Sequence, residues 1–382
     1  MNILCPCCLS VAPDIPLYNR RRIPVLNNVV YPSSTQARSC KTGKVQLLQC
    51  PECGLVFNAA YDEKIIVYDE TYDNARSHSS SYIGYLDFLC EECAPWLNRH
   101  SSVLEIGCGN GDFLKKLSNR TECRAFGYDS TYVGSECHGD RVFFSPKYYK
   151  AENSCEKYDM LILRHVLEHI ARPLNLMHEL CDLSPLKKGA WLLLEVPNFE
   201  WIINKNAYYD ITYEHCNYFS NETLSRLAGR AGFEVERVIE TFSGQYLLLF
   251  GIYTGKKKKV MDASYLTGAG HLSASFRAAK EKLVESITEA DKVCVWGASG
   301  KGVVFLSDLS EDVLEKVTYV VDINASKQGK FLPVSGKRVD PPAVLKQTND
   351  GLLVIVMNGV YESEIRTELD GMGVQATVMT AC

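Results

Sequence analysis

One stretch constrains the fold of this chain more than any other: residues 103–113, which read VLEIGCGNGDF. A short apolar segment runs directly into a glycine cluster, and an amphipathic helical pattern follows it. Glycines at positions 107, 109 and 111 let the backbone turn sharply and approach a ligand closely, because they carry no Cβ atom. The stretch therefore predicts a strand, a tight turn and a helix, with a ligand bound at the turn.

Two acidic residues narrow the kind of ligand. Glu105 lies two residues before the first glycine, where a positively charged ligand is favoured and a pyrophosphate is not. Asp129 ends a second strand-like segment one helix and one strand later, where a carboxylate can accept hydrogen bonds from both hydroxyls of a ribose. This pattern resembles the S-adenosylmethionine (SAM) site of class I methyltransferases; the alternative is a glycine turn in another α/β protein. The cofactor-binding residues that the resemblance implies are Glu105, Gly107, Gly109, Asn110, Gly111, Asp129 and His165.

Composition excludes several classes of partner. The chain has 382 residues, enough for two or three domains, and a net charge of -5. No basic field favours nucleic acid or a membrane surface, no apolar run approaches the roughly 20 residues of a membrane helix, and no signal-peptide pattern is present. We therefore expect a cytoplasmic monomer or homodimer that acts on a small molecule, with no nucleic-acid or membrane partner.

The cysteines point to a metal. In a chain without an export signal, sixteen cysteines should be mostly free thiols or metal ligands. Cys5 and Cys8 form one CxxC pair, and Cys50 and Cys53 form another; four such thiolates can close a tetrahedral zinc site. Cys7 could replace Cys8 only with worse geometry. We expect a structural zinc in an N-terminal zinc-binding domain, residues 1–75; the alternative is a set of buried free cysteines.

Two polar segments of this N-terminal part could contact a substrate. Arginines at 20–22 and at 38 could lie near the phosphates of a nucleotide-bearing substrate, although a solvated charge run is the simpler interpretation. The tyrosine-rich segment 68–78, which includes Tyr72, could form a lid or one wall of a substrate pocket. A polar linker is the equal alternative.

From about residue 100 the chain alternates strand and helix patterns, as a doubly wound parallel sheet does. Residues 158–163 read as a buried strand that ends in RHVLEH, residues 164–169, at the carboxyl edge where such folds bind ligands. Residues 191–197 read as the next strand, and 233–238 with 245–253 as a closing hairpin. We assign residues 76–255 to a SAM-dependent methyltransferase domain.

A polar loop between the strand at 191–197 and the closing hairpin holds ionisable groups. Glu214 and His215 are adjacent in it, and histidine is the natural base at neutral pH. On an extended segment the two side chains would point to opposite sides, unless the loop turns there. Ser220 then caps the next helix. Taken alone, a histidine in a loop is more often a hydrogen-bonded surface residue, but its position after the fifth strand of this fold, facing the SAM site, favours the base.

The last third of the chain repeats the strand and turn pattern. Residues 293–302 form a strand and glycine turn, 317–322 a strand that ends on an acid, and 352–357 a third strand. We assign residues 256–382 to a smaller C-terminal Rossmann-like domain. Its turn could bind a second nucleotide, but we expect a role in packing or in covering the substrate.

The order of these three units resembles the sugar C-methyltransferases of deoxysugar pathways. The resemblance rests on the paired CxxC motifs, on the Glu214-His215 loop that ends in Tyr218-Phe219-Ser220, and on the tail. Within the tail it rests on VWGA at 295–298, Lys301-Gly302, VDIN at 321–324 and KQGK at 327–330. The resemblance implies SAM-dependent C-methylation of a nucleotide-linked 4-keto-deoxysugar.

The same resemblance implies residue roles. His215 would remove the proton next to the ketone, Glu214 would orient it or hold a sugar hydroxyl, and His169 would stabilise the enolate oxygen. Tyr72, Tyr213 and Asn198 would contact the substrate. Thr212 replaces a tyrosine of the family, and Ser243-Gly244-Gln245 replaces a Gly-Gly-Ser, which leaves O- or N-methylation of a related sugar open. Two other classes remain: a zinc-knuckle binding protein with a vestigial SAM fold, and a dehydrogenase that uses the turn at 297–302.

Overall fold

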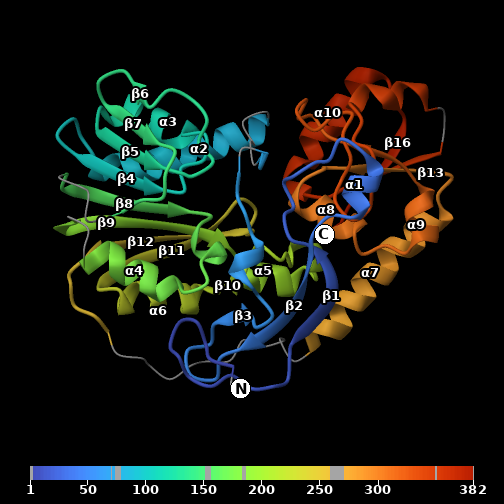
Figure 1. Ribbon diagram of the computed structural model, residues 1–382. Helices are drawn as coiled ribbons and strands as arrows, with labels where there is room; N and C mark the ends of the chain where they lie inside the picture. The colour runs from blue at the N-terminus through green and yellow to red at the C-terminus, as the bar shows by residue number, and fades with distance from the viewer. Residues whose placement is uncertain are drawn as a thin grey trace.

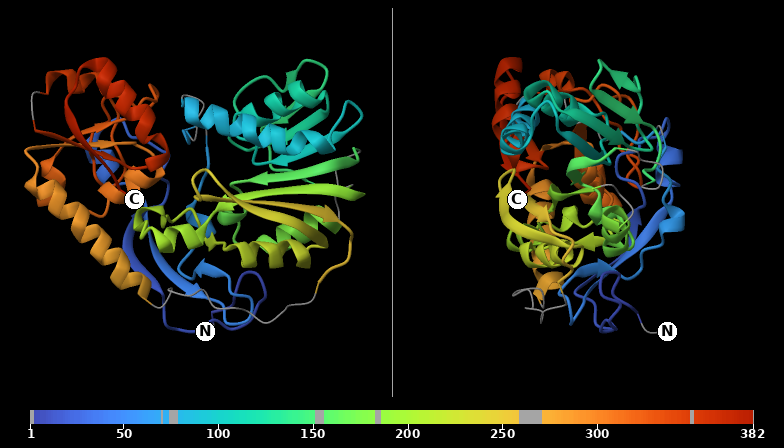
Figure 2. Two further views of the ribbon diagram at one scale, coloured as in Figure 1. Left: turned by 180° about the vertical axis from the view of Figure 1, so that it is seen from behind. Right: turned by 90° about the vertical axis from the view of Figure 1, so that its left-hand side faces the viewer.

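Three sheets organise the chain in a computed structural model, which describes residues 3–69, 71–73, 79–150, 156–182, 186–258, 271–348 and 351–381. Two α/β domains stand on either side of a small N-terminal sheet, which lies below and between them (Figures 1 and 2). The arrangement confirms the predicted fold class. The predicted boundary between residues 75 and 76 lies outside the described residues.

The large sheet is the doubly wound sheet that the sequence predicts. Its central strands run parallel, and an antiparallel hairpin closes one side. The order is β11-β12-β9-β8-β4-β5-β7-β6. The strands are β4 (Ser102–Ile106), β5 (Arg124–Tyr128), β6 (Cys137–His138), β7 (Val142–Ser145), β8 (Tyr158–Arg164), β9 (Leu186–Pro197), β11 (Phe233–Thr241) and β12 (Tyr246–Tyr253).

Helices cover both faces of this sheet because alternate residues of each strand point to opposite faces. On β8, Met160 and Ile162 join the core under α2 (Ser80–Cys93) and α3 (Asp112–Thr121). Leu161 and Leu163 join the core under α4 (Pro173–Asp182) and α6 (Asn221–Arg230). The predicted cap of α6 is confirmed: Ser220 and Thr223 form a capping box.

The C-terminal domain is a smaller parallel sheet with the order β14-β13-β15-β16. The three predicted strands are present, and β16 adds a fourth. The strands are β13 (Lys292–Trp296), β14 (Val317–Val321), β15 (Leu352–Val356) and β16 (Ala376–Thr380). The helices are α7 (Leu272–Glu289), α8 (Gly300–Leu306), α9 (Glu311–Lys316) and α10 (Glu362–Met372).

The N-terminal sheet joins the two α/β domains. It contains β1 (Tyr18–Pro24), β2 (Thr42–Gln49) and β3 (Val56–Asn58), and helix α1 (Ser34–Arg38) follows β1. Its fourth strand, β10 (Asn217–Tyr218), comes from the loop that follows His215. One continuous core contains residues from all three parts, including Leu47, Tyr218 and Phe305. The loop that carries Glu214 and His215 is therefore anchored on the N-terminal sheet.

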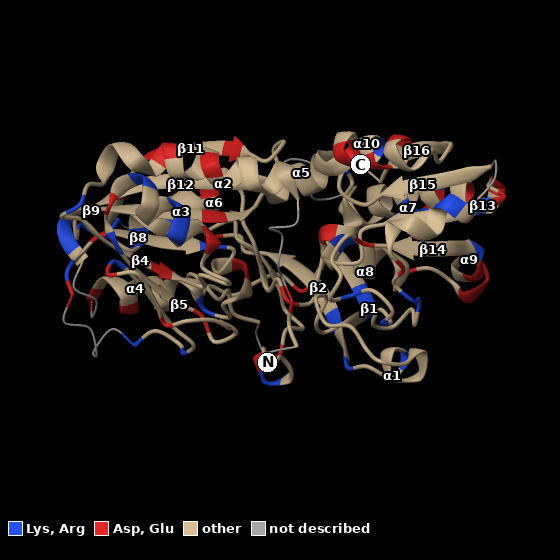
Figure 3. Ribbon diagram, turned by 90° about the horizontal axis from the view of Figure 1, so that it is seen from above, with Lys and Arg blue, Asp and Glu red and all other residues tan. Residues whose placement is uncertain are grey.

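Charged side chains of both signs are distributed over both α/β domains (Figure 3). The edge strand β11 exposes Glu234, Glu236 and Glu240, and such charges protect an edge from pairing with another strand. Among the described residues, no helix is both long and apolar enough to cross a membrane.

Candidate active site

The first glycine turn opens on a cavity of about 370 Å³ at the carboxyl edge of β4, β5 and β8. Gly107 has φ +74°, and a Cβ atom there would lie 2.3 Å from Cγ2 of Val166, so the turn requires glycine. Gly111 does not line this cavity. A Cβ atom there would lie 2.2 Å from the ring of Phe144, so packing requires the glycine. Of the predicted cofactor-binding residues, Glu105, Gly107, Gly109, Asn110, Asp129 and His165 line this cavity.

Asp129 is fixed at the end of β5 by main-chain donors. Its Oδ2 accepts a hydrogen bond from the Gly109 N–H at 2.9 Å, and its Oδ1 accepts from the Thr131 N–H at 2.8 Å. The carboxylate therefore stands beside the turn, where the predicted ribose contact requires it. The contact with the ribose itself stays a prediction.

A buried ion cluster lies beneath the same cavity. Nε of Arg164 donates to Oε2 of Glu195 at 2.6 Å, and Nη1 of Arg164 lies 3.9 Å from Oε1 of Glu105. Burial raises the pKa of Glu195, but Arg164, His165 and Tyr85 together lower it by more, so this carboxylate stays ionised. Burial raises the pKa of Glu105 to about 8. Sequence reasoning gave Arg164 and Glu195 no role, although a charge at the end of an apolar strand was a usable signal.

His165 is held between two buried carboxylates. Its Nδ1 lies 3.3 Å from Oε1 of Glu168, and its Nε2 lies 3.4 Å from Oε1 of Glu195. Its φ of +54° is rare for a residue with a side chain. The two carboxylates and the backbone turn together fix the orientation of this imidazole.

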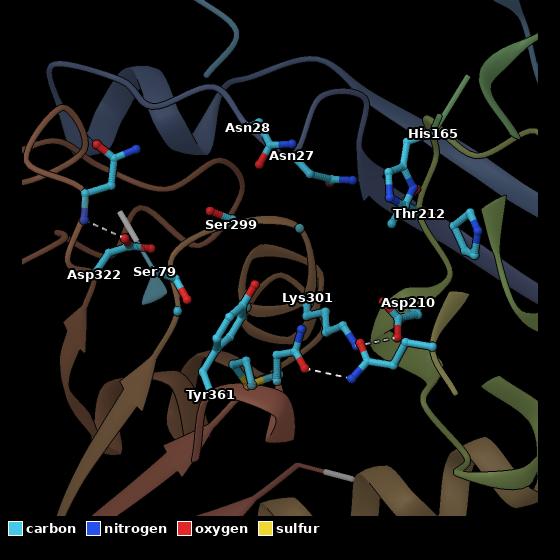
Figure 4. A pocket seen from close by; sticks show the side chains of 18 of the residues that line it. Asn27, Asn28, Ser79, His165, Asp210, Thr212, Ser299, Lys301, Asp322 and Tyr361 are labelled. Carbon is cyan, nitrogen blue, oxygen red and sulfur yellow. Dashed lines mark hydrogen bonds and ion pairs between the residues drawn. The ribbon is translucent and has the colours of Figure 1, made fainter. Parts of the chain in front are cut away.

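A second cavity of about 280 Å³ lies between the methyltransferase domain and the C-terminal domain. Figure 4 shows side chains from the N-terminal part, the loop around Asp210 and Thr212, and the C-terminal domain around it. Tyr72, Asp73, His165 and His169 line both cavities. The two cavities therefore meet at these residues. We call the first one the cofactor cavity and the second one the acceptor cavity.

The loop at 212–215 turns so that both predicted catalytic residues line the acceptor cavity. The His215 N–H donates to Oγ1 of Thr212 at 3.1 Å. Oε2 of Glu214 accepts from Nδ2 of Asn27 at 3.0 Å. Burial raises the pKa of Glu214 to about 8. Asn27 lies in the N-terminal part, and no local sequence signal pointed to it.

His169 and His215 lie side by side. Their ring centroids are 4.9 Å apart, with an interplanar angle of 83°. Burial raises the pKa of the neighbouring Glu168, but a hydrogen bond from His165 and the charges of His169 and His215 lower it by more. Ligand atoms of Glu168, His169 and His215 lie within 4.8 Å of one another, so this group could also hold a metal ion.

Two predicted substrate contacts do not line either cavity. The Tyr213 hydroxyl accepts from the Asp62 N–H at 2.9 Å, and its ring packs over Gly43. Oδ1 of Asn198 accepts from the Glu200 N–H and caps α5 (Phe199–Asn204). Both side chains are therefore used by the fold. Tyr72, the third predicted contact, does line the acceptor cavity.

The arginines at 20–22 and 38 do not reach either cavity. Nη2 of Arg20 donates to the Val304 carbonyl and to Oγ of Ser307, so it joins β1 to the C-terminal domain. Arg38 pairs with Glu311 at 2.6 Å. Arg20 and Arg38 instead contact the C-terminal domain, so their place gives the phosphate contact no support.

The C-terminal domain supplies the far wall of the acceptor cavity. Nζ of Lys301 lies 2.9 Å from Oδ2 of Asp210 and donates to Oε1 of Gln245 at 2.8 Å (Figure 4). Nε2 of Gln245 donates to Oδ1 of Asn358 at 2.8 Å. Lys301 is the one lysine or arginine among the described lining residues, which include seven acids. Thr212 and Gln245, both departures from the family pattern, line this cavity as well.

The four predicted metal ligands come together in the N-terminal part. Sγ of Cys5 lies 3.5 Å from Sγ of Cys53, and Sγ of Cys8 lies 3.4 Å from Sγ of Cys50. All four sulfurs lie within 4.8 Å of one another, and the edge of a tetrahedral zinc–thiolate site is about 3.8 Å. The Cys7 N–H points at Sγ of Cys5, as in a zinc knuckle. The donor set therefore fits zinc.

Comparison with protein families agrees with this geometry. The family model for a methyltransferase domain matches residues 81–238, and the model for a C-methyltransferase C-terminal domain matches residues 257–377. The protein is therefore a SAM-dependent methyltransferase enzyme with a C-methyltransferase C-terminal domain.

Solved structures also match, each over less than half of this chain. One is the 1,6-didemethyltoxoflavin-N1-methyltransferase of Burkholderia thailandensis, with 14% identity, 47% of this chain and 80% of that chain covered, and a TM-score of 0.35. Another is a SAM-dependent methyltransferase from Aquifex aeolicus, with 14% identity, 44% and 88% covered, and a TM-score of 0.32. No curated protein matches this chain significantly.

Proposed function

We propose that this SAM-dependent methyltransferase transfers the methyl group to carbon, on a nucleotide-linked 4-keto-deoxysugar. One observation carries the proposal: the cofactor cavity and the acceptor cavity share His169, and His215 lies beside it in the acceptor cavity, with the two ring centroids 4.9 Å apart. Carbon attack on a methyl donor needs a base and a partner for the developing oxyanion, and the two imidazoles can take these roles.

SAM, when bound, supplies a methyl group on a positively charged sulfur, which leaves as a neutral thioether. His215 takes the proton from the carbon next to the ketone, and the electron pair of that C–H bond forms an enolate. His169 donates a hydrogen bond to the enolate oxygen. The enolate carbon then forms the new bond to the methyl carbon. Glu214, held by Asn27, binds a sugar hydroxyl or orients His215.

The C-terminal domain closes the acceptor cavity over the substrate. Family membership of this domain, the Lys301 contacts and the buried Lys327 beside Ser299 support binding of the nucleotide part there. Seven acids also line this cavity and would repel a phosphate, so a phosphate there would have to be held by Lys301 against that charge. A cofactor of its own at this turn is the less economical interpretation, because the turn faces the other domain.

The alternative is O- or N-methylation of a related sugar or another small metabolite. That reaction needs a base but no enolate, so His169 would matter less than His215. Thr212 and Gln245, which line the acceptor cavity and depart from the family pattern, favour keeping this candidate.

The deciding experiment is exchange of solvent deuterium into a panel of nucleotide-linked 4-ketosugars, with S-adenosylhomocysteine (SAH) in the cofactor cavity. SAH carries no methyl group, so proton abstraction is seen alone. We expect enzyme-dependent exchange next to the ketone, and its loss by about 100-fold or more in His215→Ala. SAH binding in that variant is the control. Exchange by no member of the panel would favour O- or N-methylation.

We also propose that Cys5, Cys8, Cys50 and Cys53 hold a structural zinc ion. Four thiolates fill the shell, so the ion would order the N-terminal sheet without binding substrate. Metal analysis of purified protein should give one zinc per chain, and Cys50→Ser should lower both zinc content and thermal stability. A full zinc content in Cys50→Ser would contradict this assignment.

A further inference from the structure

Two tyrosine hydroxyl groups from one segment of the N-terminal part contact His169. The Tyr68 hydroxyl lies 3.1 Å from its Nδ1, and the two rings are nearly perpendicular, at 84°. The Tyr61 hydroxyl donates to its main-chain carbonyl at 3.3 Å. One contact therefore reaches the ring of His169, and the other only its backbone.

The Tyr68 hydroxyl can donate to Nδ1 or accept from it, and the tautomer of His169 decides which. Burial raises the pKa of Tyr68, and the nearby Glu214 raises it further, so the phenol carries the proton that donation needs. A phenol that donates to a neutral imidazole needs an unprotonated nitrogen as acceptor. An imidazole that accepts at Nδ1 carries its own proton on Nε2.

We propose that Tyr68 is a positioning residue, which holds His169 with its proton on Nε2. His169 lines both cavities, and in this proposal its Nε2–H is the donor to the substrate oxygen. The other tautomer would present a lone pair to the substrate oxygen and would repel it. This role rests on the proposed enolate chemistry, in which His169 must donate a hydrogen bond.

The inference gives the N-terminal part a function in catalysis besides its predicted zinc site. The same part supplies Asn27, which holds Glu214, and Asn28, whose Nδ2 donates to the Tyr72 hydroxyl at 3.1 Å. Three side chains on the rim of the chemistry are thus oriented by groups that come before the methyltransferase sheet in the chain. The methyltransferase domain alone would lack all of these contacts.

The first test is a spectrum of the ring nitrogens. Full-length protein labelled with ¹⁵N-histidine and saturated with SAH is compared with Tyr68→Phe by two-bond ¹H–¹⁵N correlation. His169→Gln identifies the signals of His169. We expect an unprotonated Nδ1 and a protonated Nε2 in the wild type, and a mixture of tautomers in Tyr68→Phe. A protonated Nδ1 in the wild type, or an unchanged spectrum in the variant, would overturn the proposal.

Tyr61→Phe is the matched control. It removes a hydroxyl from the same segment and the same histidine, but one that touches only the carbonyl oxygen. The tautomer of His169 should be unchanged in this variant. Equal changes in the two variants would mean that loosening of the segment, and not the ring contact, sets the tautomer.

The second test is turnover with an acceptor found by deuterium exchange. Loss of one ordinary hydrogen bond should lower kcat of Tyr68→Phe about 5- to 10-fold, with KM for SAM within about twofold of wild type. A changed tautomer with unchanged kcat would overturn the role of His169 in the proposed function, but not the tautomer assignment. The spectrum thus separates failure of this inference from failure of the proposed reaction.

Discussion

The protein uses one backbone pattern twice, in the turn at 107–111 and in the turn at 297–302. In each, an aspartate at the end of the next strand accepts from a main-chain N–H of the turn: Asp129 from Gly109 at 2.9 Å, and Asp322 from Ala298 at 2.7 Å. The other oxygen of each carboxylate accepts from the N–H two residues further along. The two carboxylates are therefore held in a similar way, although the donor stands two residues after the first glycine in one turn and one residue after it in the other.

The two turns differ in the residue beneath them and in what lies opposite. Two residues before the first glycine stands Glu105 in one turn and Val295 in the other, and both are buried. The first turn faces a cavity built largely by its own domain, whereas the second faces the acceptor cavity and the other domain. A shared topology thus leaves the ligand open, and the two turns differ by one buried acid and by the wall that stands opposite.

The largest expected effect is a loss of stability when a tightly packed glycine of the second turn is replaced. In Gly302→Ala a Cβ atom would lie 1.8 Å from the carbonyl oxygen of Gly297, a main-chain atom that cannot move aside. We expect a loss of stability of ~3 kcal/mol or more, seen as a lower midpoint of thermal unfolding. Gly109→Ala is the control, because its Cβ meets no atom within 4 Å and only its φ of +53° costs about 1–2 kcal/mol. Equal losses would mean that the predicted clash with the Gly297 carbonyl oxygen adds nothing to the cost of the substitution.

The second prediction concerns the two aspartates. Asp129→Ala should weaken SAH binding by about 10- to 100-fold, because a charged hydrogen-bond acceptor for the ribose is lost. Asp322→Ala should leave SAH affinity unchanged and should raise KM for the acceptor instead. Isothermal titration with SAH measures the first effect and steady-state kinetics the second. Equal loss of SAH affinity in both variants would remove the functional difference between the turns.

The third prediction concerns Glu105, the buried acid that only the first turn has. The pKa of Glu105 is raised to about 8, whereas an unfolded glutamate titrates near about 4.3. Between these values the folded state holds a proton that the unfolded state has released, so the contribution of Glu105 to stability falls as pH rises. The thermal midpoint of Glu105→Gln should therefore fall less than that of the wild type between pH 5 and pH 8.5. An identical fall in both proteins would show that Glu105 does not titrate in this range.

The smallest expected effect concerns the contact across the acceptor cavity. Lys301→Met removes the partner of Asp210 and Gln245 and should raise KM for the acceptor about fivefold, with SAH affinity unchanged. Lys280→Met is a useful comparison, since that lysine pairs with Asp308 away from the cavity lining. A change of SAH affinity in Lys301→Met would show that the two cavities are coupled through this wall.

Features that depend on neighbouring residues were predictable from the sequence. The glycine turns, the acids that follow them, the Ser220 cap and the spacing of the four cysteines are local patterns, and the structure contains each of them. The meeting of His169 and His215 was implied by the family resemblance rather than by spacing. This meeting depends on strand β10, which fixes the loop that carries His215 on the N-terminal sheet.

Other roles depended on contacts between residues far apart in the sequence. Tyr213 and Asn198 were predicted to contact the substrate, but the Tyr213 hydroxyl instead contacts the Asp62 backbone and Oδ1 of Asn198 caps a helix. Arg20 looked like a phosphate ligand, yet it joins β1 to the C-terminal domain.

The sequence by itself determined the main strands and glycine turns of the two α/β domains, the parallel type of their sheets and the four cysteines that come together, because these follow from periodicity and short spacing. The tertiary structure alone decided which side chains orient the chemistry. Tyr68 and Asn27 reach His169 and Glu214 only because the N-terminal sheet packs against both α/β domains. A hydrogen bond across 101 or 187 residues leaves no mark on the local pattern, since only folding brings its partners together.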